Sequence, residues 1–516
     1  MKRLSLALFA LAAAAGAADA VVVNPRGQGQ ALIFPYYTTA AGNSSVLTLT
    51  NQSPQAKIVR IRFAEGENGR TAAQLDVYLG LYDTWTAALF ARGDGEAPGL
   101  LTTDNSCTNP PIATSTSLPQ LPDGRRYLPL GPAITDDAGS DAPQRLREGF
   151  VEALELASIR RPSPTYFSIV PATNGRPGDC AAVIAASTPP SGYWIAEPLR
   201  DLANPTGGLS GEISVVDVAA GIVFATSAVA LEDYRSDPLD RPRGTTASVA
   251  LNGALSGPAS LLGHALNDPA ARIARARVLV GGETLSLSYP APERAIDAVS
   301  AVLTATELFG TYEETPALGA HTSFVLTYPT RPLYTDAAQS GAAQPLAPFT
   351  RAFAGVRPPA AADATGFVLY DRDALMLRFL IPGPGCGFPC PPHPPVVRLP
   401  GTAVEVLALG ATSDPLLGTR LPGDIGFQQS DGGRYVADGA GHLRLILHQS
   451  LSSTTPALSR PSLEGHRLSG LPVLGLRLIN YVNANAAPGL LANYSSALPM
   501  TADVRCVDAA GQPCVP

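Results

Sequence analysis

Glycine and proline are spread along the whole chain and restrict the secondary structure that it can form. The 516 residues include 49 glycines and 49 prolines. Proline breaks the interior of a helix and glycine weakens it, so short elements joined by turns are favoured over long helices. We therefore expect a β-rich protein of two or three domains, because single hydrophobic cores stop growing at about 300 residues.

Apolar and polar side chains alternate between residues 31 and 90, which is the two-residue period of half-buried strands. Turn-forming residues separate the runs, with Gly66 and Gly69 placed where a hairpin needs positive φ. The pattern predicts a mainly β fold of antiparallel β-sandwich-like domains, with a few short helices and long Pro/Gly-rich loops. Arg60 and Arg62 alternate with apolar residues, so we expect both on a solvated strand face.

Further strands are expected at 150–159, 192–196, 213–218 and 222–231, and a helix within 296–309. A long loop is expected at 97–142 and a Pro/Cys-rich connection at 383–395, because dense prolines do not fit a central strand. These signals divide the chain into a leader (1–20), a β-sandwich-like domain (21–190), a second β-rich domain (191–380) and a C-terminal β-rich region (396–516).

The first twenty residues have the features of a secretory signal peptide. Lys2 and Arg3 precede an apolar run from Leu4 to Gly16, and small residues follow at 18–20. An uncleaved anchor is the alternative. No later run reaches the roughly 18 apolar residues of a membrane helix, so we expect no transmembrane segment after cleavage. The expected location is the periplasm, the outer cell surface or the extracellular space.

Six cysteines lie beyond the leader: Cys107, Cys180, Cys386, Cys390, Cys506 and Cys514. An even number in an exported chain indicates disulfides, and six cysteines allow 15 pairings. The close pairs Cys386/Cys390 and Cys506/Cys514 would close short loops and leave Cys107 with Cys180. Zinc or redox chemistry is the alternative, but the spacings match neither kind of motif.

Composition and motifs exclude several classes of function. A net charge of −7 argues against nucleic-acid binding. The sequence contains neither a phosphate-binding GxxxxGK[ST] loop nor a GxSxG nucleophile elbow. We therefore name no catalytic residue, cofactor or metal ligand, and an enzyme is the less favoured class.

Three sets of residues give a weak indication of a metal-binding site. Each set is more simply interpreted as solvated polar residues. His442 and His448 would share one side of a strand, and two acidic sets would offer oxygens to calcium. The acidic sets are Asp136, Asp137 and Asp141, and Asp233, Asp237 and Asp240, the second beside arginines that would balance it.

Aromatic residues are sparse, and the chain has two tryptophans, Trp85 and Trp194. Exposed aromatic rings serve as platforms for sugars, so both are candidate ligand contacts. Packing in the core is the simpler interpretation for both and the one that we favour.

Several segments together resemble a family of uncharacterised exported proteins of similar length from proteobacteria. The matching stretches include TDNSCTNP and NGRPGDCAAV and lie at 31–39, 63–89, 103–110, 147–159, 174–183, 205–231, 297–303, 324–334 and 470–494. The resemblance implies export and no established activity, cofactor or catalytic residue.

Three hypotheses for the function follow. The first is a non-catalytic exported protein of the cell envelope or surface that acts through protein or surface contacts. The second is a binding module for an envelope or extracellular glycan, and the third is a hydrolase with an unrecognised carboxylate site.

Overall fold

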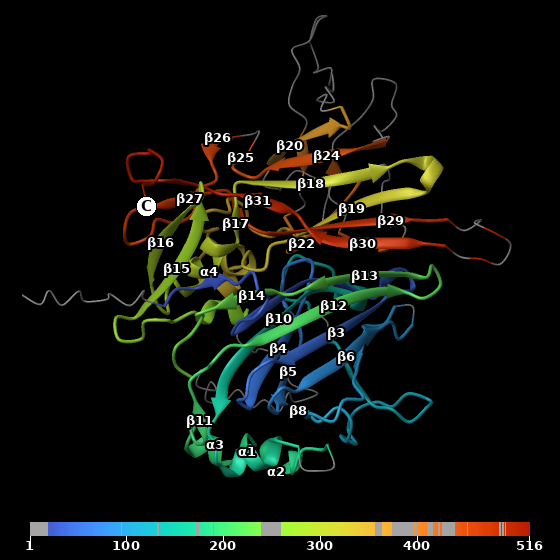
Figure 1. Cartoon of the computed structure of the whole chain (residues 1–516), viewed down its shortest axis with the longest axis vertical. Coiled ribbons are helices and arrows are strands. Elements are labelled where there is room, and N and C mark those ends of the chain that lie inside the picture. Colours follow the sequence, from blue (N-terminus) through green and yellow to red (C-terminus); the bar gives the residue numbers. More distant parts are fainter. Residues whose placement is uncertain are drawn as a thin grey trace, which may run out of the picture.

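Figure 1 shows the computed structural model. It describes residues 19–515 except 94, 132–133, 172–174, 189, 239–259, 357–363, 374–395, 399–400, 410–415, 422–423, 426–438, 451–452, 484–486, 488–489 and 491. Most of the expected leader, the connection 383–395 with Cys386 and Cys390, and Asp240 lie outside the described residues.

Two antiparallel sheets form a first sandwich, as the alternation predicts. Sheet A has the order β1-β14-β2-β10-β4-β5-β8, with β11 paired to β10, and sheet B has the order β13-β12-β3-β6-β7-β9. The strands of sheet A are β1 (Val22–Val23), β14 (Val229–Glu232), β2 (Ala31–Thr38), β10 (Glu148–Ile159), β4 (Lys57–Glu65), β5 (Thr71–Leu79), β8 (Cys107–Asn109) and β11 (Leu202–Ala203). Those of sheet B are β13 (Ile222–Ser227), β12 (Leu209–Asp217), β3 (Ser44–Asn51), β6 (Thr84–Phe90), β7 (Gly99–Leu101) and β9 (Tyr127–Pro129).

Two more antiparallel sheets form a second sandwich. Sheet C has the order β22-β19-β29-β30, and sheet D has the order β23-β21-β20-β24-β18-β31. The strands of sheet C are β22 (Val404–Ala408), β19 (Ala320–Thr327), β29 (Leu474–Tyr481) and β30 (Tyr494–Pro499). Those of sheet D are β23 (Asp424–Ile425), β21 (Val396–Arg398), β20 (Ala364–Asp371), β24 (Gly439–Ile446), β18 (Glu307–Glu314) and β31 (Thr501–Asp503).

The remaining elements are short and lie around the two sandwiches. Four strand pairs are β15 (Ile273–Val280) with β16 (Glu283–Pro290), β17 (Thr304–Ala305) with β28 (Leu471–Pro472), β25 (Gln449–Ser450) with β26 (Ser453–Pro456), and β27 (Arg467–Ser469) with β32 (Arg505–Val507). The helices are α1 (Pro164–Ile169), α2 (Cys180–Ala186), α3 (Tyr193–Ala196), α4 (Ala295–Leu303), α5 (Pro332–Thr335), α6 (Ala337–Ser340) and the 3₁₀ turns η1 (Ala40–Gly42), η2 (Pro143–Arg147), η3 (Leu261–His264) and η4 (Pro316–Leu318).

The sheets join segments that the expected boundaries separate. In sheet B, β3 pairs with β12, with Leu47 opposite Ile213, so the boundary expected between residues 190 and 191 lies inside the first sandwich. In sheet D, β20 pairs with β24 across the expected connection at 383–395. Local sequence signals mark loops, whereas strand neighbours in a sandwich are set by contacts distant in sequence.

Sheet C lies between sheet D and the first sandwich (Figure 1). Main-chain hydrogen bonds join the sandwiches, because the amides of Ala403 and Val404 donate to the carbonyls of Glu67 and Gly66 at 2.9 and 2.8 Å. The hairpin containing Gly66 therefore docks directly against the second sandwich. Gly69 has φ +64°, as expected for this turn, whereas Gly66 does not adopt the positive φ expected of it.

The expectation that Arg60 and Arg62 face solvent is wrong. They are 2% and 1% exposed. Sheet A is covered on both sides, by sheet B and by the second sandwich with its connecting segments, so its outer face is interior. Arg60 pairs with Asp76 at 2.7 Å and Arg62 with Glu152 at 3.0 Å, which compensates their burial.

Two expected elements differ in type or extent. Residues 192–196 were expected as a strand but contain α3, whose Trp194 donates to the carbonyl of Arg200 at 2.9 Å. The expected helix 296–309 ends at Leu303, after which the chain enters β17 and β18. The threonines at 304 and 306 fit strands better than helix. The expected loop 97–142 contains the short strands β7, β8 and β9.

Candidate functional site

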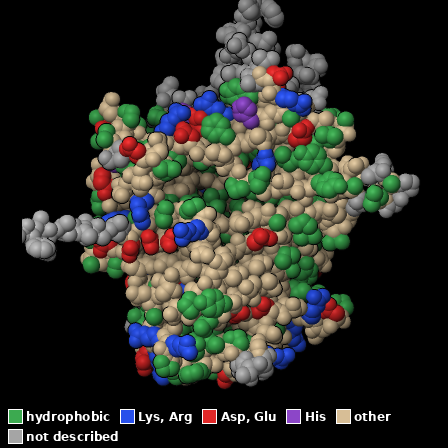
Figure 2. All heavy atoms as spheres, viewed as in Figure 1, with side chains coloured by type: hydrophobic (Ala, Val, Ile, Leu, Met, Phe, Trp, Pro, Cys, Tyr) green, Lys and Arg blue, Asp and Glu red, His purple; other side chains and the backbone are tan. Residues whose placement is uncertain are grey.

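A cavity lies at the seam between the two sandwiches, and we call it the seam cavity. Its volume is about 410 Å³. Strands from both sandwiches line it, with Val22 from β1, Leu308 from β18 and Leu476 from β29 among the contributors. Figure 2 shows a hollow between the two halves of the molecule, bordered by hydrophobic side chains. Ligand pockets of proteins have volumes of roughly 300–1,000 Å³, so this cavity is large enough for a small molecule.

The lining of the seam cavity is mainly apolar, with Thr226, Ser227 and Thr304 as its uncharged polar side chains among the described residues. Among the described residues that line it, Arg277 alone carries a formal charge. Its guanidinium lies 3.6 Å from a carboxylate oxygen of Asp233. The pKa of Asp233 is raised, first by burial and then by the negative charges of Asp19 and Glu232. Asp233 therefore lies close enough to offset part of the charge of Arg277, and the apolar remainder of the lining offers contacts to an uncharged molecule.

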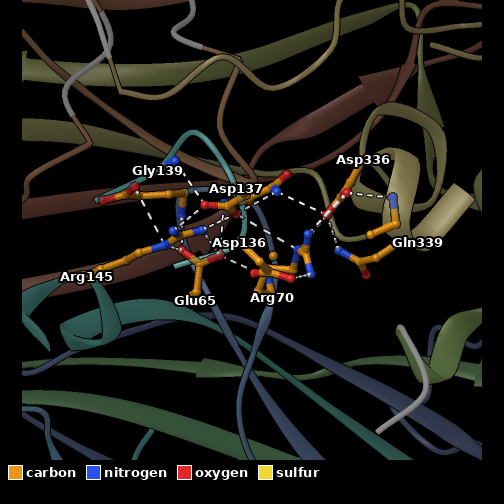
Figure 3. A network of polar contacts seen from close by, with 12 residues as sticks. Glu65, Arg70, Asp136, Asp137, Gly139, Arg145, Asp336 and Gln339 are labelled. Atoms are coloured by element: carbon orange, nitrogen blue, oxygen red, sulfur yellow. Dashed lines mark hydrogen bonds and ion pairs between the residues drawn. The ribbon is translucent and has the colours of Figure 1, made fainter. Parts of the chain in front are cut away.

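A second notable group is a buried ion-pair network at the junction of the sandwiches (Figure 3). Arg145 contacts Glu65 at 2.9 Å and Asp137 at 2.7 Å. Arg70 contacts Asp336 of the second sandwich at 2.6 Å. The network therefore connects the β4–β5 hairpin, the segment before β10 and the start of α6.

Two of the three acids considered as a weak calcium candidate, Asp136 and Asp137, belong to this network. Asp137 accepts hydrogen bonds from Arg145 and Asn68, and Asp136 accepts one from Arg70. The arginines thus occupy the positions where a cation would neutralise the carboxylates. The described residues contain no group of three or more His, Cys, Asp or Glu side chains arranged to hold a metal ion.

Among the carboxyl groups of this junction, Glu67 has the pKa that is shifted furthest from its ordinary value. Burial raises its pKa to about 7, while the amide of Ser140, which donates to it at 2.8 Å, opposes the shift. Neighbouring Glu65 accepts hydrogen bonds from the amides of Glu67, Asn68 and Arg70. These carboxyl groups are bound to the protein's own donors, which is the arrangement of a structural junction.

Both tryptophans lie in the interior, as the favoured core-packing interpretation predicts. Trp85 is 0% exposed between sheets A and B, and Trp194 is 3% exposed. The Trp194 ring stacks on Tyr78 with centroids 6.4 Å apart. Neither ring presents a face to solvent on which a sugar would stack, so the expected ligand contacts are not placed for that role.

Disulfides join Cys107 to Cys180 and Cys506 to Cys514, which confirms two of the three expected pairings. They indicate an oxidising compartment. Cys386 and Cys390 lie outside the described residues. Within the described part of the chain, none of the helices has the length and hydrophobicity needed to span a bilayer.

The other metal candidates are dispersed. His442 lies on β24 and stacks on Tyr370, whereas His448 lies beyond the end of that strand. Arg235 pairs with Asp237 at 3.1 Å, as expected for an acidic set balanced by its own arginines.

The sequence did not predict the seam cavity. Its lining comes from strand edges far apart in the chain, and the sequence pattern of each strand alone is typical of core residues.

Comparison of the chain with protein-family models, curated proteins and solved structures finds no match.

Proposed function

We propose that this protein is an exported, non-catalytic binding protein of the bacterial cell envelope that takes an uncharged apolar molecule into the seam cavity. The apolar cavity of about 410 Å³ between the sandwiches is the observation that carries the proposal. The disulfides support an extracytoplasmic location. The glycan alternative loses its support, because both tryptophans are buried.

The physical basis is removal of apolar surface from water. Side chains such as Val278, Val473 and Met500 line the cavity, and each buried methylene of a ligand contributes about 0.8 kcal/mol. Because the cavity is built from strands of both sandwiches, its shape is fixed by the fold and little ordering of side chains opposes binding.

Binding of the neutral fluorescent probe N-phenyl-1-naphthylamine tests the proposal. Ala502 lines the cavity, and its side chain is exposed on β31, so Ala502→Trp places a large ring at the opening without entering the core. We expect saturable binding to the wild-type protein and an affinity at least about tenfold lower for Ala502→Trp.

The matched control is Ala185→Trp, an exposed position on α2 at the far end of the first sandwich (Figure 1). It adds the same ring and should leave probe binding unchanged. Absence of binding to the wild-type protein, or equal affinity in Ala502→Trp, would overturn the proposal.

A further inference from the structure

A second cavity lies at the open edge of the second sandwich, on the other side of β31, and we call it the edge cavity. Its volume is about 300 Å³. Arg477 of β29 and His442 of β24 line it, together with the hydroxyl-bearing Thr311 and Thr501. Phe309 and Leu498 supply apolar surface. Five strands from both sheets of the sandwich, β18, β24, β29, β30 and β31, thus contribute to one lining.

Arg477 of β29 is a half-buried arginine whose guanidinium is only partly satisfied by the protein. Within the described residues it forms no ion pair, and its Nε is buried without a hydrogen bond. Its Nη1 donates to the hydroxyl of Thr311. By contrast, Arg444 on β24 pairs with Glu307 at 2.7 Å, and the arginines on the outer face of sheet A all contact carboxylates.

The electrostatic consequence is a cation held partly out of water without a counter-charge. Burial lowers the pKa of Arg477, and the neighbouring group that opposes this shift is Tyr481. A desolvated guanidinium with an unused N–H is costly unless an anion or a hydrogen-bond acceptor reaches it. The edge of a guanidinium matches the two oxygens of a carboxylate.

The remainder of the edge cavity offers surfaces for the apolar part of a ligand. The His442 ring stacks on Tyr370 with centroids 4.5 Å apart and an interplanar angle of 11°, so it is held as a flat surface. Phe309 is half-buried, and Leu498 is 49% exposed. A ligand that covers these side chains would remove apolar surface from water.

We propose that the edge cavity binds a small organic carboxylate, with its carboxylate on Arg477 and its apolar body against Phe309, His442 and Leu498. A monoanion fits better than phosphate, because Arg477 is the one permanent cation in the lining and phosphate binding sites combine several charged donors. This site is separate from the seam cavity and does not depend on its function.

Calorimetric titration of the full-length protein with four probes tests this proposal. Benzoate supplies both the charge and the apolar body, benzamide keeps the body without the charge, acetate keeps the charge without the body, and inorganic phosphate supplies another anion. We expect benzoate to bind at least about tenfold more tightly than each of the others. Equal binding of benzamide, acetate or phosphate would overturn the assignment of the ligand class.

Two variants locate the site. Arg477→Gln should lower benzoate affinity at least about tenfold, and Arg477→Lys should restore part of it, because a point charge replaces the bidentate fork. Arg272→Gln removes the same charge from a side chain that is 69% exposed and should have no effect. Unchanged benzoate binding in Arg477→Gln would contradict the proposal. The circular dichroism spectrum and the midpoint of urea unfolding serve as the folding check, since Arg477→Gln should leave the fold intact.

Discussion

Lys57 and Glu155 form an ion pair inside the first sandwich, with 2.7 Å between Nζ and Oε1 and both side chains 0% exposed. Glu155 also accepts hydrogen bonds from the amides of Thr206 and Gly207, and Lys57 donates to the hydroxyl of Thr206. Burial lowers the pKa of Lys57, and the charge of Glu155 opposes this shift. The pair therefore fastens β4 and β10 to the segment that leads into β12.

Removing one member of this pair should be strongly destabilising. Lys57→Met leaves the Glu155 carboxylate buried without its cation, and we expect the free energy of unfolding in urea to fall by about 3–5 kcal/mol. The double variant Lys57→Met/Glu155→Gln should lose less than the single variant, because no unpaired charge remains. Arg125→Ala breaks the exposed pair with Asp123 and should change little. A single variant as stable as the wild type would refute this account of the pair.

The two disulfides should differ in their contribution to stability. Their cysteines are 73 residues apart for Cys107–Cys180 and 8 residues apart for Cys506–Cys514. Loop-closure entropy predicts losses of about 4 and about 2.5 kcal/mol when each bridge is removed by a pair of Cys→Ala substitutions. Urea unfolding of the two double variants measures the difference. Equal losses, or a larger loss for the short loop, would show that native-state contacts outweigh chain entropy.

Stability should depend on pH through Glu67. Its pKa in the folded protein is about 7, above the ordinary value of 4.5, so the folded state binds this proton more tightly. Stability contributed by the protonated form is present at low pH and is lost as the pH rises from about 4.5 to about 7, by at most about 3 kcal/mol. Glu67→Gln should remove this part of the pH dependence and raise stability above pH 7.

The control for this experiment is Glu283→Gln, which alters an exposed carboxyl group on β16. Its unfolding free energy should follow the wild-type pH profile. A Glu67→Gln profile parallel to that of the wild type would exclude Glu67 as the titrating group.

Two glycines with similar backbone angles should respond differently to alanine. Gly27 has φ +70° and an added Cβ would meet nothing within 4 Å, so Gly27→Ala should cost only the backbone strain of about 1–2 kcal/mol. Gly69 has φ +64°, and an added Cβ would lie 2.3 Å from Cγ of Pro332. Gly69→Ala should therefore lower the unfolding free energy further, because it separates the hairpin from α5. Equal losses of unfolding free energy in the two variants would show that backbone strain, and not the contact with Pro332, accounts for the effect.

The sequence was sufficient to predict strands but not their neighbours. The alternation around Ile61 and Phe63 identifies β4 and the face that packs against sheet B, because a two-residue period depends on adjacent residues alone. The opposite face is covered by later segments of the chain, including η3 and the residue before it, where Leu261 and Ser260 donate hydrogen bonds to Glu152, the partner of Arg62. This is why Arg60 and Arg62 were assigned to solvent although they are buried in ion pairs.

The cavities could not be predicted from the sequence for the same reason, because they depend on contacts between segments that are distant in the chain. The local sequence around Val22, Leu308 and Leu476 predicts only that each lies in a strand. The space between these residues arises where the two sandwiches dock. Arg477 gives no local signal, because its distinguishing feature is that none of the described residues places a carboxylate within ion-pair distance, and the neighbouring strands are distant in sequence. By contrast, the Cys107–Cys180 and Cys506–Cys514 bridges agree with the expectation that the closely spaced cysteines close short loops and leave Cys107 with Cys180.

The most direct test of the binding role is a chain-length series of neutral n-alcohols that compete with N-phenyl-1-naphthylamine for the seam cavity. If the cavity binds by burying apolar surface, affinity should rise about fourfold with each added methylene until the chain fills the space. Ala502→Trp should remove this dependence. Affinities that do not change with chain length, or that are the same in Ala502→Trp as in the wild type, would contradict the account.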